Sequence, residues 1–147
     1  MALGAKLDKK KFHTLVILGD GECMEGSIWE AASFASAWNL SNLIAIIDNN
    51  GLGATDFVRN FIGKTNFKDK FKSFGWTVFE VDGHNFNSLI PVFLKIKNRK
   101  FNNPIAIIAN TIKGKGISFM ENDPHWHHGI PKGNFLSKAM KELGIKQ

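Results

Sequence analysis

Four short apolar runs divide the chain, and each is followed by glycine, aspartate or asparagine. The runs cover residues 14–18, 43–47, 76–81 and 105–109. Runs of this length between turn-forming residues predict strands that are buried on both faces, which is the pattern of a parallel sheet.

Longer segments of mixed polarity predict helices between and after the runs. They cover residues 27–38, 67–74, 87 or 88 to 97, and 133–143. The first of them opens with Ser27-Ile-Trp-Glu30, which matches the capping-box pattern. It is apolar nearly all round, so we expect this helix to be largely buried.

The alternation of strand and helix predicts an α/β fold, with a parallel sheet covered by helices on both faces. The 147 residues fit a single domain over residues 1–147. In such sheets ligands bind outside the carboxyl ends of the strands. Asp20, Asn50 and Asp82 are the polar residues expected at those ends.

Composition narrows the function classes only a little. A hydrophobic content of 44% and a charged content of 22% are typical of a soluble globular protein. The net charge of +6 fits either a lysine-rich surface or attraction to anions. The single cysteine, Cys23, excludes an intrachain disulfide, and no apolar run approaches the ~20 residues of a membrane span. We therefore expect a cytoplasmic protein without a membrane partner.

The sequence Gly19-Asp20-Gly21 follows the first predicted strand directly. Glycines allow the backbone to approach a ligand closely, and the following helix offers N–H groups to an anion. The dinucleotide-binding pattern fails here because Met24 stands where its third glycine should be. A bare aspartate would repel phosphate, so Asp20 fits a phosphate site only if a cation lies between them.

Asn50 supplies the second expected oxygen ligand, at the end of the next predicted strand. Mg²⁺ prefers oxygen ligands and is commonly bound by one or two carboxylates together with phosphates. Two plainer interpretations remain. Asp20 could be a turn residue in a glycine-rich loop, and Asn49-Asn50-Gly51 could be an ordinary turn.

Gly-Asp-Gly followed about 30 residues later by Asn-Asn resembles the thiamine diphosphate motif. The surrounding segments narrow the resemblance to transketolases, especially the N-terminal subunit of split transketolases. Those segments are residues 19–26, 42–49, 74–84 and 111–119, and the similarity extends over residues 1–131. The resemblance implies the thiamine-diphosphate-binding fold, with thiamine diphosphate and Mg²⁺ as cofactors.

The resemblance also implies the cofactor ligands. The side chains of Asp20 and Asn50 and the carbonyl of Leu52 would bind Mg²⁺. Gly19 and Gly21 would support the diphosphate, with the Gly21 N–H as a donor.

Two histidines and two acids match further positions of the family. His128 matches a histidine near the diphosphate and substrate, with His127 as the alternative. Zinc at His125, His127 and His128 is disfavoured because the single cysteine is distant. Glu25 and Glu30 match acids near the dimer interface that are thought to link two active sites. Glu30 also has the structural explanation given by the capping box.

The chain departs from the family in two places. Family members usually carry extra residues beside the cofactor ring, where this chain has only Gly53-Ala54-Thr55. Residues 1–8 resemble the end of a helix from inside the family domain, so we expect an N-terminally incomplete domain with one side of its sheet uncovered.

The resemblance implies transfer of a two-carbon ketol unit between sugar phosphates. A C-terminal, pyrimidine-binding subunit would be required, in a homodimer or heterotetramer. The alternative is a non-catalytic truncated fragment, or an assembly subunit that needs a partner chain to bind the cofactor. The charge of +6 suggests a nucleic-acid binder as a third possibility, but the sequence shows no nucleic-acid-binding module, so we expect no nucleic-acid partner.

Overall fold

Four parallel strands form the central sheet in the computed structural model of the protein, which describes residues 1–145. The strands are β1 (Thr14–Gly19), β2 (Leu43–Asn49), β3 (Thr77–Asp82) and β4 (Ile105–Asn110). Their order across the sheet is β1-β2-β4-β3, and every neighbouring pair is parallel. All four carboxyl ends therefore meet at one edge.

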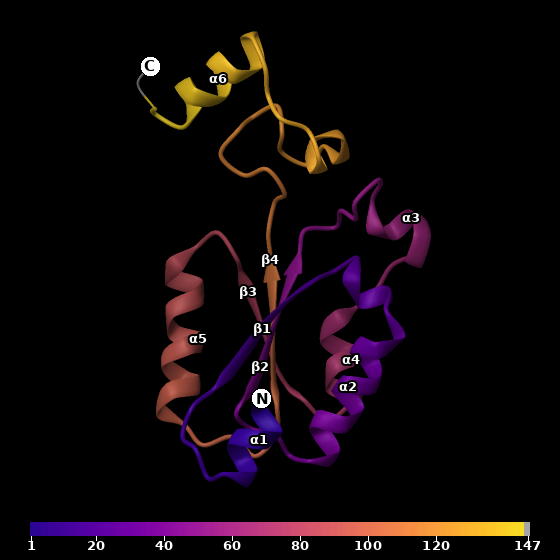
Figure 1. The fold of residues 1–147 in the computed structure, drawn as a ribbon, viewed down its shortest axis with the longest axis vertical. Helices are drawn as coiled ribbons and strands as arrows, with labels where there is room; N and C mark the ends of the chain where they lie inside the picture. The colour runs from indigo at the N-terminus through magenta and orange to yellow at the C-terminus, as the bar shows by residue number, and fades with distance from the viewer. Residues whose placement is uncertain (146–147) are drawn as a thin grey trace.

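Helices cover both faces of this sheet, as the sequence predicted (Figure 1). On one face lie α2 (Gly26–Ala37) and α4 (Phe67–Ser73), and on the other lies α5 (Phe86–Asn98). The remaining helices are α1 (Ala2–Leu7), α3 (Val58–Ile62), α6 (Asn134–Glu142) and the short 3₁₀ turns η1 (Glu22–Met24) and η2 (Pro124–His127). Within residues 1–145, no helix combines the length and apolar character that a membrane crossing requires.

Alternating side chains of the two central strands supply the two halves of the core. Ala45 and Ile47 of β2 belong to the cluster beneath α2 and α4, whereas Ile44 belongs to the cluster beneath α5. On β4, Ile107 and Ile108 divide between the two clusters in the same way. Because side chains on a strand point alternately to opposite faces, a central strand covered on both sides must be apolar throughout.

Phe71 of α4 joins the helices on one face to the sheet. Its ring is 1% exposed, and its centroid lies 5.4 Å from that of Trp29 and 5.2 Å from that of Trp76. The indole N–H of Trp76 donates to the carbonyl of Ala32 over 2.9 Å, which satisfies the polar atom of a buried aromatic residue. This aromatic contact fixes α4 against α2.

The edge strand β1 is less buried than the sequence predicted. Leu15 is 53% exposed and Ile17 is 72% exposed, because they point to the face that α5 covers over β3, and no element among residues 1–145 covers β1 on that face. The expectation that α2 is largely buried is also wrong. Only Ala32 and Ala35 of this helix are buried, although it is apolar nearly all round.

The expected capping box at the start of α2 is absent. The helix begins at Gly26 with Glu25 as its N-cap, and no side chain caps it. Ser27 therefore lies inside the first turn, where its hydroxyl is past the position from which it would cap the helix.

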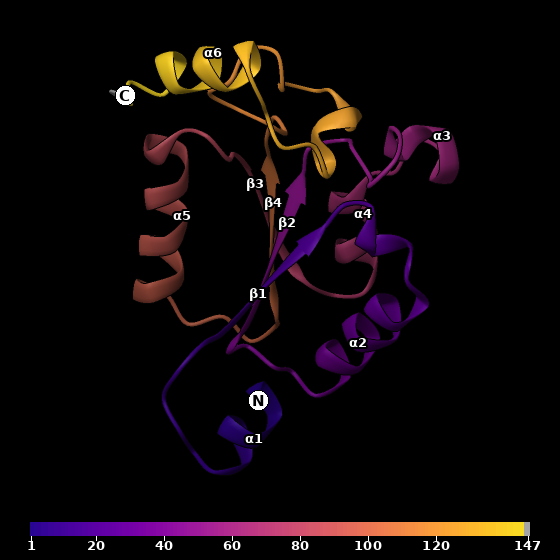
Figure 2. The same ribbon diagram turned by 45° about the horizontal axis from the view of Figure 1, so that its top comes forward.

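Residues 111–145 extend beyond the carboxyl ends of the strands (Figures 1 and 2). Phe119, Trp126 and Phe135 form an aromatic cluster there, with ring centroids 5.0 to 5.4 Å apart. The backbone N–H and hydroxyl of Ser118 donate to Glu142 of α6. These contacts hold the segment together above the edge of the sheet where a ligand is expected.

Replacing Phe71 tests the packing of α4. Phe71→Ala should lower the free energy of unfolding by about 3–5 kcal/mol, because it leaves a cavity between two tryptophans. Phe86→Ala, at a side chain that is 75% exposed, should change it by less than about 0.5 kcal/mol. Urea unfolding followed by tryptophan fluorescence measures both, and equal losses would contradict this packing.

Candidate cofactor site at the carboxyl edge of the sheet

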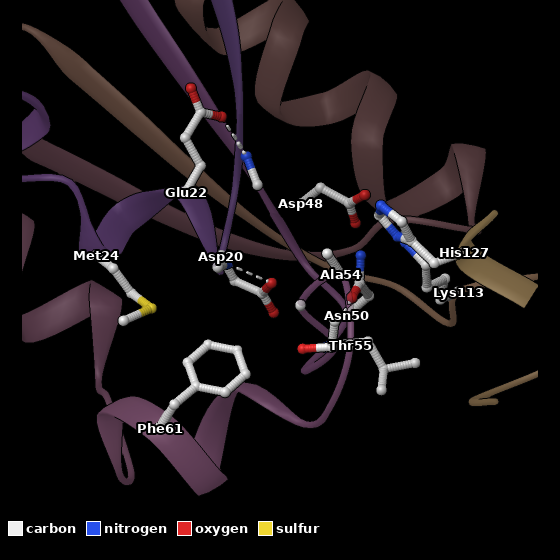
Figure 3. A pocket seen from close by; sticks show the side chains of 14 residues that line it. Asp20, Glu22, Met24, Asp48, Asn50, Ala54, Thr55, Phe61, Lys113 and His127 are labelled. Atoms are coloured by element: carbon white, nitrogen blue, oxygen red, sulfur yellow. Dashed lines mark hydrogen bonds between the residues drawn. The ribbon is translucent and has the colours of Figure 1, made fainter. Parts of the chain in front are cut away.

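A cleft of about 630 Å³ opens at the carboxyl ends of β1 and β2 (Figure 3). The loop after each strand contributes to its walls, and the segment beyond β4 closes one side. The lining residues are Gly19, Asp20, Gly21, Glu22, Met24, Asp48, Asn50, Leu52, Gly53, Ala54, Thr55, Phe61, Lys113 and His127. Five of the residues predicted from sequence, namely Gly19, Asp20, Gly21, Asn50 and Leu52, are thus brought together.

Asp20 is the buried polar residue on which the cleft centres. Its side chain is 1% exposed, although it is a carboxylate. One carboxylate oxygen accepts the N–H of Gly21 over 2.7 Å, and the other accepts the N–H of Gly51 in a short hydrogen bond. The backbone N–H of Asp20 donates to the carbonyl of Asp48 over 3.2 Å. Asp20 therefore ties the loop after β1 to the loop after β2.

Burial raises the pKa of the Asp20 carboxyl above its ordinary value of 3.8. The hydrogen bonds from Gly51 and Gly21 act in the opposite direction, the charge of Asp48 adds to the rise, and the charge of Lys113 reduces it. The net rise in pKa means that the protein stabilises the charged Asp20 carboxylate less well than water would. A bound divalent cation would supply that compensation.

Asn50 reaches the same cleft from the loop after β2 (Figure 3). Its side-chain oxygen accepts the N–H of Leu52 over 2.9 Å. An amide oxygen has two lone pairs, so it can still coordinate a cation while it holds that N–H. Leu52 also lines the cleft and is 4% exposed, and its carbonyl as a metal ligand stays a prediction.

The loops after β1 and β2 approach each other closely. A Cβ atom on Gly21 would lie 3.4 Å from the Cα of Gly53, and a Cβ on Gly53 would lie 2.5 Å from the ring of Phe61. A Cβ at position 21 would therefore just touch Gly53, whereas a Cβ at position 53 would displace the Phe61 ring of α3. The absence of side chains at both positions lets these backbone segments form adjacent walls of the cleft.

Lys113 is a lining residue that the sequence analysis did not single out. It follows β4 by three residues, and the charge of Lys113 lowers the pKa of Asp20 and of His127. The hydroxyl of Thr111 donates to Asp48 and so anchors the start of the same segment. The sequence signal for Lys113 is its position shortly after the predicted strand at 105–109, because Asp20 and Asn50 also follow predicted parallel strands.

The structure separates the two candidate histidines. His127 lines the cleft, and Lys113, burial and His128 lower its pKa, in that order of size. Both residues are exposed, but His128 lies outside the set of lining residues, with its ring centroid 4.5 Å from that of His127. The geometry therefore favours the alternative, His127, as the histidine at the cleft.

The two predicted interface acids do not reach the cleft. Glu25 is the N-cap of α2 and Glu30 lies within that helix, and both are exposed. A role at a dimer interface stays a prediction for both. Asp82, at the end of β3, is exposed and lies outside the cleft as well.

The donor set suits a hard cation such as Mg²⁺. No group of three or more His, Cys, Asp or Glu that could hold a metal ion occurs within residues 1–145. A cation in this cleft would therefore combine the Asp20 carboxylate with amide, carbonyl and ligand oxygens. That combination is the one Mg²⁺ takes when it binds phosphate-bearing molecules.

Comparison with solved structures gives the class to which this fold belongs. The chain matches the transketolase of Campylobacter jejuni with a TM-score of 0.86 and 27% identity, over 98% of this chain and 23% of that one. It matches the transketolase of Leishmania mexicana with a TM-score of 0.77 and 27% identity, over 90% of this chain and 20% of that one. The α/β sheet is the sheet found in transketolases.

Sequence comparison agrees. The chain is 39% identical over 145 residues to one of the subunits of the apulose-4-phosphate transketolase of Phocaeicola vulgatus, covering 97% of this chain and 50% of that protein. It is 39% identical over 144 residues to human transketolase, covering 98% of this chain and 22% of that protein. The model of the family described as "Transketolase, thiamine diphosphate binding domain" matches residues 5–147. The chain belongs to this family, as its motifs predicted.

The raised pKa of Asp20 predicts a pH effect on stability. At pH values between 3.8 and the raised pKa, the Asp20 carboxyl is protonated more often in the folded protein than in the unfolded chain. The contribution of Asp20 to the free energy of unfolding therefore falls as pH rises through this range. Asp20→Asn cannot titrate, so its unfolding free energy relative to wild type should increase as pH rises above 3.8. Urea unfolding over a pH series measures this, with Asp82→Asn as control. A relative stability that falls with rising pH would contradict the burial of the charge.

Proposed function

We propose that this chain supplies the Mg²⁺ and diphosphate anchoring half of a transketolase-type active site. The complete site would transfer a two-carbon ketol unit between sugar phosphates. The acid that activates the cofactor's pyrimidine ring would come from a partner chain. Bound thiamine diphosphate would supply the carbanion chemistry, and the residues of this chain would hold and orient it.

One observation carries the proposal. A buried carboxylate and an amide side chain, Asp20 and Asn50, follow neighbouring parallel strands and line one cleft (Figure 3). The cleft has a lysine, Lys113, on another wall. A cation bound between Asp20 and Asn50 would lie next to a negative carboxylate. A diphosphate that extends from this cation toward Lys113 would lie between two positive charges.

Each residue has a distinct task in this arrangement. Asp20 would share its charge with the cation, and Asn50 would add a neutral oxygen, so the site would not be overloaded with negative charge. Lys113 would compensate the charge of the diphosphate, and neutral His127 would donate a hydrogen bond to it. Stabilisation by fixed donors of this kind needs no rearrangement when charge develops during the reaction.

Exposed apolar side chains on both faces of the sheet support the need for a partner. Leu15 and Ile17 of β1, together with Phe34 and Trp38 of α2 and its C-cap, each expose between 47% and 72% of their surface. The chain spans about half the length of the two apulose-4-phosphate transketolase subunits that it matches, at 50% and 51% of those proteins, and their names imply a second subunit. We infer that this chain binds the cofactor most tightly within a larger assembly, as the alternative interpretation also requires.

Calorimetric titration of thiamine diphosphate with Mg²⁺ tests the proposal. Asp20→Ala should weaken binding by more than about 10–100-fold, the range observed when groups one shell further from a metal are removed. The titrations are made with the chain alone and with a pyrimidine-binding transketolase chain added.

Asp8→Ala is the control. Asp8 is exposed and is the C-cap of α1, which lies at the opposite end of the sheet from the carboxyl ends of the strands (Figure 1), so the variant should bind like wild type. Unchanged binding in Asp20→Ala, or equal losses in both variants, would remove the assignment of the metal site.

Separate substitution of the two histidines decides which of them serves the site. His127→Ala should weaken thiamine diphosphate binding by about 2–13-fold, which corresponds to one hydrogen bond. His128→Ala should stay within about twofold in the same titration, since His128 lies outside the cleft. The reverse order would restore His128, the histidine that the sequence favoured.

A further inference from the structure

We propose that His84 is a positioning residue that holds Lys113 at the cleft through the backbone of Ile112. The effect on cofactor binding rests on the proposed function. The contact itself does not.

The contact is a hydrogen bond between a ring nitrogen and a backbone amide. Nε2 of His84 lies 2.8 Å from the N–H of Ile112 and accepts it. An imidazole nitrogen accepts only when it carries no proton, so this contact requires the neutral tautomer with its proton on Nδ1. His84 reaches Ile112 from the loop after β3, whereas Ile112 follows β4. The bond therefore joins the ends of two neighbouring strands.

The segment that leads to Lys113 is held from both sides, and the His84 contact is one of the bonds that hold it. Thr111 is anchored to Asp48 on the side of β2. On the side of β3, the N–H of Gly83 donates to Asn110 over 2.8 Å, and a Cβ on Gly83 would lie only 2.4 Å from the side chain of Thr111. The His84 contact comes after these anchors and directly before Lys113.

Lys113 is the residue through which the contact would affect the site. It lines the cleft with Asp20 and His127 (Figure 3). It also lines a second hollow of about 380 Å³ with His84. Its charge acts on the pKa of both Asp20 and His127. The carbonyl of Lys113 accepts the N–H of Asn122 over 3.0 Å, so loss of the Ile112 anchor would loosen the backbone that carries this charge without freeing it.

Two variants test the hydrogen bond. His84→Gln places a side-chain oxygen at the same number of bonds from the backbone as Nε2, so it can still accept the Ile112 N–H. His84→Ala removes the acceptor. Together they distinguish the role of the contact from a general effect of the side chain.

Amide exchange tests the contact without any cofactor. By NMR, the Ile112 amide should exchange about three- to tenfold faster in His84→Ala than in wild type, and at the wild-type rate in His84→Gln. Ring ¹⁵N shifts should show Nε2 as the unprotonated nitrogen. Unchanged exchange in His84→Ala, or a proton on Nε2 in the neutral ring, would overturn the proposal.

Titration with thiamine diphosphate and Mg²⁺ tests the consequence. At pH ~8, His84→Ala should bind about three- to tenfold more weakly than wild type, and His84→Gln within about twofold. Equal affinities of wild type and His84→Ala would contradict a role for this contact in cofactor binding.

The outcomes separate this inference from the proposed function. Binding that Asp20→Ala abolishes, but that His84→Ala leaves unchanged, would overturn the role of His84 alone. Absence of binding in every variant would overturn the proposed function. In that case the exchange rate of Ile112 still decides whether His84 holds the segment.

Discussion

The burial of the Asp20 carboxylate is the constraint around which this edge of the sheet is built. A charge with 1% exposure has lost its hydration and must be compensated by donors that the protein fixes in place. Gly21 and Gly51 provide them from two different loops. The same two hydrogen bonds hold the ends of β1 and β2 together. They therefore stabilise the Asp20 carboxylate and also fix the shape of the cleft.

Strand order then determines which charges meet. β1, β2 and β4 are neighbours, and the residues that follow them are an acid, an amide and a lysine: Asp20, Asn50 and Lys113. This order gives the cleft a negative side and a positive side with a neutral oxygen between them. Such a gradient matches a cation joined to a diphosphate better than it matches either ion alone.

The sequence predicted the strands, the fold class and the pairing of Asp20 with Asn50, because apolar runs and their end residues are local features. The resemblance led us to expect one uncovered side of the sheet, but the sequence could not identify Ile17 as the exposed residue, since a run of apolar residues does not show whether another segment covers it. Lys113 was missed because a lysine in a loop is usually solvated. His127 is the last residue of η2 and His128 follows it, so the choice between them depends on where this turn ends. The spacing of residues in the sequence does not determine that end.

The uncovered side of β1 links assembly to the cofactor site. Covering a side chain such as Ile17 stabilises an interface by roughly 1.5–3 kcal/mol, and Ile17 lies three residues before Asp20 on the same strand and loop. A chain that covers β1 would thus stabilise the backbone that positions the carboxylate. Binding free energies are reciprocal, so a cation and diphosphate gripped by Asp20 would strengthen the attachment of that partner by the same factor.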